Sequence, residues 1–102
     1  MVALSDVIYS QDQIREILDP IFKSHNVKKA ILFGSYAKGS ATGLSDVDIL
    51  VDSGLNGLRF FGLLEDVVTS LNKKVDLIDT SQLVPNSKIE NEIVKNGVVI
   101  YE

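Results

Sequence analysis

The chain has 102 residues, of which 45% are hydrophobic and 24% charged, and its formal net charge at pH 7 is −4. This size predicts one small globular domain over residues 1–102. The acidic total argues against a broad grip on nucleic acid, which needs a basic face, so no direct nucleic-acid partner is expected. The absence of cysteine excludes disulfides, thiolate zinc sites and cysteine nucleophiles, and a single histidine argues against a histidine-based site. No stretch reaches ~18 apolar residues and no signal pattern opens the chain, so we expect a cytoplasmic protein without a membrane partner.

An amphipathic helix is predicted over about residues 11–25. Ser10 and Gln13 have the spacing of a capping box at its start. Because proline lacks a backbone donor, we expect Pro20 to kink or shorten this helix. Apolar residues recur at helical spacing through it: Ile14, Ile17, Leu18, Ile21 and Phe22.

Strands and helices alternate in the rest of the chain. A short turn or helical turn at 36–38 and a loop rich in Gly, Ser and Thr at 39–45 separate the first two strands. The pattern predicts strands at 28–33, 47–51, 75–78 and 98–101, and helices at 57–71 and 86–96. Lys73 and Lys74, which precede the third strand, are expected to be solvated. This order predicts a small α/β or α+β fold.

Three aspartates form the candidate metal site. Asp46 and Asp48 are two residues apart at the start of the second strand, so their side chains should lie on the same face. Two neighbouring carboxylates repel each other and need a cation, and Mg²⁺ suits oxygen ligands while keeping positions open for phosphates. Asp76 lies in the third strand among apolar residues, and it would join the cluster if that strand lies beside the second.

A candidate phosphate site precedes the acids. Gly34 ends the first strand and allows close approach to the backbone, while the Ser35 hydroxyl and the following amides can hold anionic oxygens. Lys38 either adds a positive charge there or is a plain surface lysine. Ser45 either caps the turn before the strand or contacts phosphate. An anion site beside an acidic metal cluster is what nucleotide transfer requires.

These residues carry a family resemblance. Leu32-Phe33-Gly34-Ser35-Tyr36-Ala37-Lys38-Gly39, followed by Ser45-Asp46-Val47-Asp48-Ile49-Leu50-Val51 and the third acid in Lys74-Val75-Asp76-Leu77-Ile78, resembles the DNA polymerase β-like nucleotidyltransferase superfamily. The match is more specifically similar to the minimal nucleotidyltransferases, which are often paired as antitoxins with HEPN-domain toxins. It covers residues 28–102 and departs from the family at Lys38, where arginine is more common.

The resemblance implies a nucleotidyltransferase fold: a small mixed β-sheet with helices packed mainly on one face. It implies that Asp46, Asp48 and Asp76 bind two Mg²⁺ ions, with Mn²⁺ as the alternative, and that Asp76 helps to deprotonate the acceptor hydroxyl. The implied reaction moves NMP, AMP in the first instance, from an NTP to a hydroxyl on a partner protein.

Larger relatives carry an extra domain that holds the acceptor, for which this chain has no room, so a HEPN-domain toxin or a second copy of the chain is expected to supply it. Two alternatives stay open at this point. One is a non-catalytic module that neutralises its partner by contact, and the other is a small-molecule nucleotidyltransferase similar to aminoglycoside-modifying enzymes.

Overall fold

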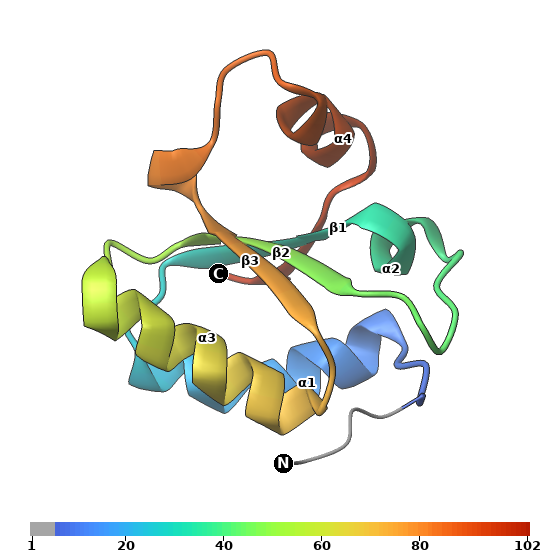
Figure 1. The fold of residues 1–102 in the computed structure, drawn as a ribbon, viewed down its shortest axis with the longest axis horizontal. Coiled ribbons are helices and arrows are strands. Elements are labelled where there is room, and N and C mark those ends of the chain that lie inside the picture. The colour runs from blue at the N-terminus through green and yellow to red at the C-terminus, as the bar shows by residue number, and fades with distance from the viewer. Residues whose placement is uncertain (1–5) are drawn as a thin grey trace.

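A four-stranded sheet with the strand order β3-β2-β1-β4 forms the centre of the molecule, which we describe over residues 6–102 of a computed structural model (Figure 1). The central pair, β1 and β2, is antiparallel, as is β1 with β4, whereas β2 and β3 run parallel. The predicted mixed sheet is therefore confirmed. The strands are β1 (Lys29–Phe33), β2 (Val47–Asp52), β3 (Val75–Asp79) and β4 (Val98–Tyr101). The helices are α1 (Gln11–Ser24), α2 (Gly34–Lys38), α3 (Gly57–Leu71) and α4 (Lys88–Asn96), with a 3₁₀ turn η1 (Thr80–Gln82).

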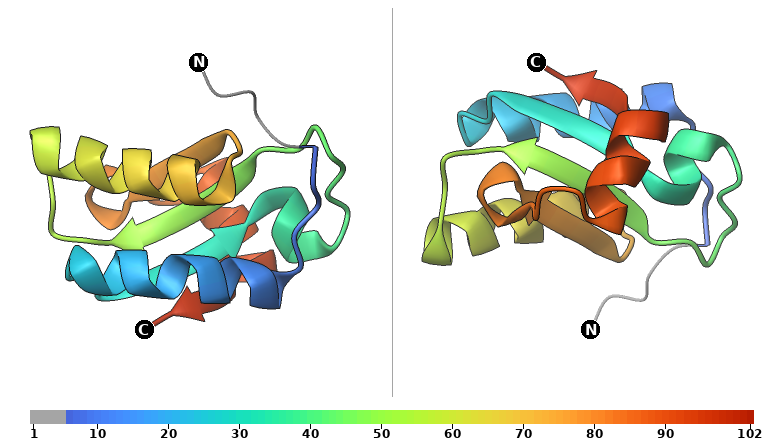
Figure 2. Two further views of the ribbon diagram at one scale, coloured as in Figure 1. Left: turned by 90° about the horizontal axis from the view of Figure 1, so that it is seen from below. Right: turned by 90° about the horizontal axis from the view of Figure 1, so that it is seen from above.

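The two long helices, α1 and α3, pack side by side on one face of the sheet (Figures 1 and 2). Alternate residues of the strands point toward them and form the main core, because successive side chains of a strand face opposite sides. The fully buried members of this core include Ile14 and Leu18 of α1, Leu63 and Val67 of α3, and Val47, Ile49 and Val51 of β2.

The N-terminal helix begins as the sequence predicts. The Ser10 side chain accepts a hydrogen bond from the Gln13 backbone, and the Gln13 side chain accepts one from the Ser10 backbone. The helix continues past Pro20 to Ser24, so the expectation that Pro20 shortens it is wrong. The carbonyl that a donor at position 20 would pair with belongs to Glu16, and both Glu16 and Pro20 are exposed residues.

The opposite face of the sheet is covered less completely, by the short helix α4, while α2 continues from the end of β1 and buries Tyr36 in the main core (Figure 1). Ile93 of α4 packs there against Phe33 and Leu50 in a second, smaller core cluster. The long helices thus lie on one face as expected, while the other face keeps room for polar groups. No helix within residues 6–102 is long and apolar enough to cross a membrane.

A buried acid joins the far ends of β2 and β3. Asp79 is 5% exposed and accepts hydrogen bonds from the Ser53 backbone, the Ser53 hydroxyl and the Ser81 backbone. Burial alone would raise the pKa of the Asp79 carboxyl, but these hydrogen bonds hold it below its usual value. Asp79 is therefore a structural acid, distinct in environment from the acids at the other end of the strands.

Candidate functional site

Asp48 and Asp76 lie directly opposite each other on the parallel strands β2 and β3. Their neighbours Val47, Ile49 and Leu77 belong to the main core, so the two aspartates face the other side of the sheet. Asp48 is partly buried, whereas Asp76 is exposed. The condition set by the sequence, that the third strand lie beside the second, is met.

Gly34 packs against Asp48 at the point where β1 ends and α2 begins. Its φ of +69° is a left-handed conformation that favours glycine. A Cβ atom at Gly34 would overlap the Asp48 carboxylate, with Oδ2 as the nearest atom. The glycine is therefore required by the acid as well as by the backbone turn, a reason that the sequence alone did not reveal.

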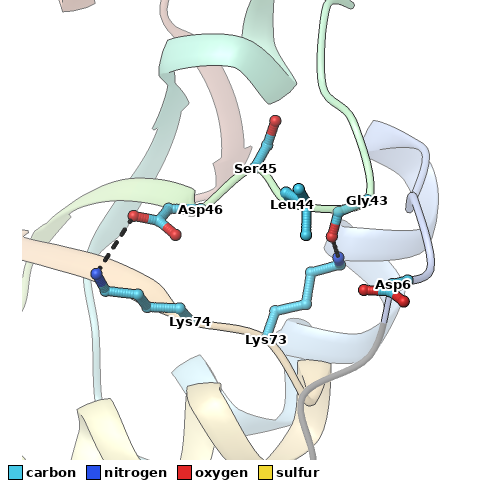
Figure 3. Close-up of a pocket in the computed structure, with 7 residues that line it drawn as sticks. All are labelled: Asp6, Gly43, Leu44, Ser45, Asp46, Lys73 and Lys74. Atoms are coloured by element: carbon cyan, nitrogen blue, oxygen red, sulfur yellow. Dashed lines mark hydrogen bonds and ion pairs between the residues drawn. The ribbon is translucent and has the colours of Figure 1, made fainter.

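Asp46 stands at the end of the loop that leads into β2. Lys74, just before β3, brings its Nζ to 3.8 Å from Asp46 Oδ2 (Figure 3). The Val47 backbone amide donates to the Lys74 carbonyl at 3.0 Å, which joins the beginnings of the two strands. The three predicted metal ligands are thus placed along the same end of β2 and β3.

Lys73 supports the loop that leads into β2. The expectation that this lysine is solvated is wrong. It is only 2% exposed, and its Nζ donates to the Gly43 carbonyl at 3.1 Å (Figure 3). A cavity of about 230 Å³ lies beside this contact and reaches Asp46. Its lining residues are Asp6, Gly43, Leu44, Ser45, Asp46, Lys73 and Lys74.

Burial and electrostatic repulsion both act on the Asp48 carboxyl. Partial burial, followed by the charges of Asp76, Asp46 and Glu92, raises the pKa of the Asp48 carboxyl from 3.8 to about 6. Within residues 6–102, no three acidic or histidine side chains form a ready-made ion site. The donor set nevertheless fits a hard divalent cation, because it consists of carboxylate oxygens that repel one another in its absence.

The remaining predicted residues divide between the site and its surroundings. Ser35 follows Gly34 at the start of α2 and is partly buried. The Ser45 hydroxyl accepts a hydrogen bond from the Thr42 backbone at 2.9 Å, so it stabilises the loop while also lining the cavity. Lys38 reaches across to α4, where its Nζ lies 2.9 Å from Glu92 Oε1.

Glu92 is a residue that sequence reasoning missed. It contributes to the field at Asp48 and pairs with Lys38, yet it lies far from the aspartates in the chain. Its position in α4 resembles that of any charged residue on a helix, and only the packing of α4 beside α2 brings it to the site.

The family model described as "Polymerase beta, Nucleotidyltransferase" matches residues 16–102. The chain belongs to this nucleotidyltransferase family. A relative in Methanocaldococcus jannaschii, named a "putative protein adenylyltransferase", is 37% identical over 90 residues, covering 81% of this chain and 94% of the relative.

Solved structures share the fold of this nucleotidyltransferase. A toxin–antitoxin crystal structure with AMP-PNP has a TM-score of 0.69 at 23% identity, covering 85% of this chain and 72% of the other. A tri-AMPylated HEPN toxin of Shewanella oneidensis in complex with an MNT antitoxin gives a TM-score of 0.64 at 21% identity, covering 89% and 71%. At these identities the likeness establishes the fold, and the predicted fold class is confirmed.

The crowded acid predicts an unusual dependence of stability on pH. The raised pKa of Asp48 means that the folded chain holds an extra proton between pH 3.8 and about 6. The contribution of this group to stability therefore falls as pH rises through that window. We expect Asp48→Asn to raise the melting temperature of the metal-free protein at pH 8 and to change it less at pH 4.

Asp52→Asn is the matched control, because Asp52 is an exposed acid on the same strand, away from the cluster. Thermal melts in a chelating buffer measure the effect. If the Asp48→Asn protein melted at a lower temperature than wild type at pH 8, the result would contradict the destabilising effect of burial and like charges on the Asp48 carboxylate.

Proposed function

We propose that the chain is a Mg²⁺-dependent adenylyltransferase that moves AMP from ATP to a hydroxyl on a partner protein. The observation that carries this proposal is the pairing of Asp48 with Asp76 beside the Gly34 turn, with Asp46 at the same strand ends. Acidic oxygens next to an anion-accommodating turn suit an NTP bound with its metal. The name of the Methanocaldococcus relative supports a protein acceptor.

The partner that we propose is a HEPN-domain toxin, for which this chain would act as the antitoxin. The support is the toxin–antitoxin assemblies among the structures that share the fold, one of which contains an AMPylated HEPN toxin. In this proposal the partner contributes a hydroxyl, tyrosine being our choice, and the chain contributes the nucleotide site.

The residues divide the work by their exposure. Asp46, Asp48 and Asp76 would hold Mg²⁺, which when bound would orient the triphosphate and offset its charge. Asp76 is the exposed member of the Asp48–Asp76 pair, so an incoming hydroxyl can reach its carboxylate. Asp76 accepts the hydroxyl proton as the new oxygen–Pα bond forms and the bond from Pα to the bridging oxygen breaks, releasing pyrophosphate.

The glycine turn offers one test of the nucleotide site. Gly34 and Gly39 both have positive φ, +69° and +78°, so alanine at either costs roughly 1–2 kcal/mol of backbone strain. A Cβ overlaps Asp48 at Gly34 but meets nothing within 4 Å at Gly39. We expect Gly34→Ala to weaken the binding of AMP-PNP with Mg²⁺ at least tenfold, about 1.4 kcal/mol, and Gly39→Ala to leave it nearly unchanged.

Calorimetric titration of the two folded variants measures this difference. If both variants bound AMP-PNP equally well, the contact between Gly34 and Asp48 would have no part in nucleotide binding.

The transfer step is tested by Asp76→Asn, which keeps the shape of the side chain and removes its basic oxygen. Loss of a general base typically lowers a rate ~10²–10⁴-fold, and loss of a metal ligand adds to this. The assay incubates the HEPN partner with labelled ATP and measures its mass. We expect AMP adducts with wild type and with the exposed-acid control Asp52→Asn, and almost none with Asp76→Asn.

Docking of the partner should survive in Asp76→Asn, because a single exposed carboxylate changes. Full neutralisation of the toxin by this variant, without an adduct even from wild type, would mean that the chain acts by contact alone.

A further inference from the structure

Helix α4 brings an acid and a cation together at the border of the nucleotide site. Lys38, the last residue of α2, lies with its Nζ 2.9 Å from Glu92 Oε1. The Glu92 side chain is 28% exposed and that of Lys38 46%, so the pair is partly shielded from water. Partial shielding makes such a contact more effective than a fully exposed ion pair.

The packing of α4 fixes where Glu92 stands. The next residue, Ile93, is buried against Phe33 and Leu50, which lie on the same face of the sheet as Asp48. Gly97, which follows α4, lies close to Ile31 of β1 and to the Ile93 carbonyl. A Cβ atom on Gly97 would overlap that carbonyl and crowd the Ile31 side chain. Helix α4 is therefore held firmly on the sheet, and Glu92 with it.

Glu92 also lies close enough to the acid cluster for its charge to act on Asp48. Lys38 ends the short helix α2, whose first residue, Gly34, packs against Asp48, so the ion pair with Glu92 lies on the helix that starts at the acid cluster. The contact is an ion pair without hydrogen-bond geometry, since Glu92 Oε1 is buried and has no hydrogen-bond partner, so the three donors of the Lys38 ammonium stay available for a second anion. Lysine has a flexible stem and lacks the rigid fork of arginine, so a fixed partner restricts where its charge can go.

We propose that Glu92 is a positioning residue that holds Lys38 where its ammonium meets the β- and γ-phosphates of the nucleotide. This inference rests on the proposed function, since it assumes that a nucleoside triphosphate binds beside Asp48. It makes α4 part of the nucleotide site, and it accounts for a lysine at a position where a freely moving side chain would hold phosphate poorly.

The test compares a triphosphate with a monophosphate. AMP-PNP and AMP, each with Mg²⁺, are titrated by calorimetry into wild type, Glu92→Ala and Glu92→Gln. We expect Glu92→Ala to weaken AMP-PNP about three- to fivefold, the range of a partly exposed ion pair, and to leave AMP unchanged. Glu92→Gln keeps the shape and should give a smaller loss of the same kind, which covers the case in which the alanine variant fails to fold.

A double-mutant cycle separates positioning from general stability. In a Lys38→Ala background, Glu92→Ala should weaken AMP-PNP no further, because its effect runs through Lys38. Asp19→Asn is the matched control: Asp19 pairs with Lys23 at the same 2.9 Å distance, but both residues lie on α1, across the sheet from the site. This control should change neither affinity.

Four outcomes would overturn the inference. Tighter binding of AMP-PNP by Glu92→Ala would mean that Glu92 competes with phosphate for Lys38. Equal weakening of AMP and AMP-PNP would mean that Glu92 only supports the fold. If wild type bound AMP but not AMP-PNP, the positioning role would fall while a nucleotide site remained, and if it bound neither, the proposed function would fall with it.

Discussion

Two carboxylates placed opposite each other on neighbouring parallel strands are the constraint on which the candidate site depends. Asp48 and Asp76 share the polar face of the sheet, with Asp46 and Glu92 adding to the negative field. Burial of Asp48, and after it the like charges around it, oppose its ionisation in the folded chain, and both raise the pKa of its carboxyl. The arrangement persists because the rest of the fold supplies enough stability to hold it.

That stability comes from the other face of the sheet. The side chains that alternate with the aspartates, such as Val47 and Ile49, are fully buried under α1 and α3. Strand β2 therefore serves both purposes: Val47, Ile49 and Val51 face the main core, while Asp48 lies on the opposite face with Leu50, which packs under α4. Local contacts add precision: Lys73 holds the loop before Asp46 through the Gly43 carbonyl, and Gly34 leaves space for the Asp48 carboxylate.

Much of this follows from the sequence because it depends on local pattern. The capping box of α1, the strand that carries Asp46 and Asp48, and the end of α4 near Gly97 are each encoded within a few residues. The placement of Asp76 could be stated only as a condition, because the order of strands in a sheet depends on tertiary packing.

The features that the sequence concealed depend on contacts between distant segments. Lys73 has the composition of a solvated junction, yet the loop folds over it and its ammonium finds a carbonyl 30 residues away in the chain. In the sequence Asp79 resembles an ordinary acid at the end of a strand, whereas in the structure Ser53 and Ser81 donate hydrogen bonds to its carboxylate. Glu92 reaches the site only because Ile93 anchors α4 on the sheet. In each case the side chain that decides the environment belongs to another element.

Binding of a divalent cation to the aspartate cluster tests the account most directly. Isothermal titration of Mg²⁺ in the presence of ATP, repeated with Mn²⁺, compares wild type with the double variant Asp46→Asn and Asp48→Asn. Because these substitutions remove two of the repelling carboxylates, the variant should fold at least as well as wild type while losing the cation. Saturable binding by wild type and none by the variant is the result that the account predicts. Equal binding by both proteins would show that the cluster is not the metal site.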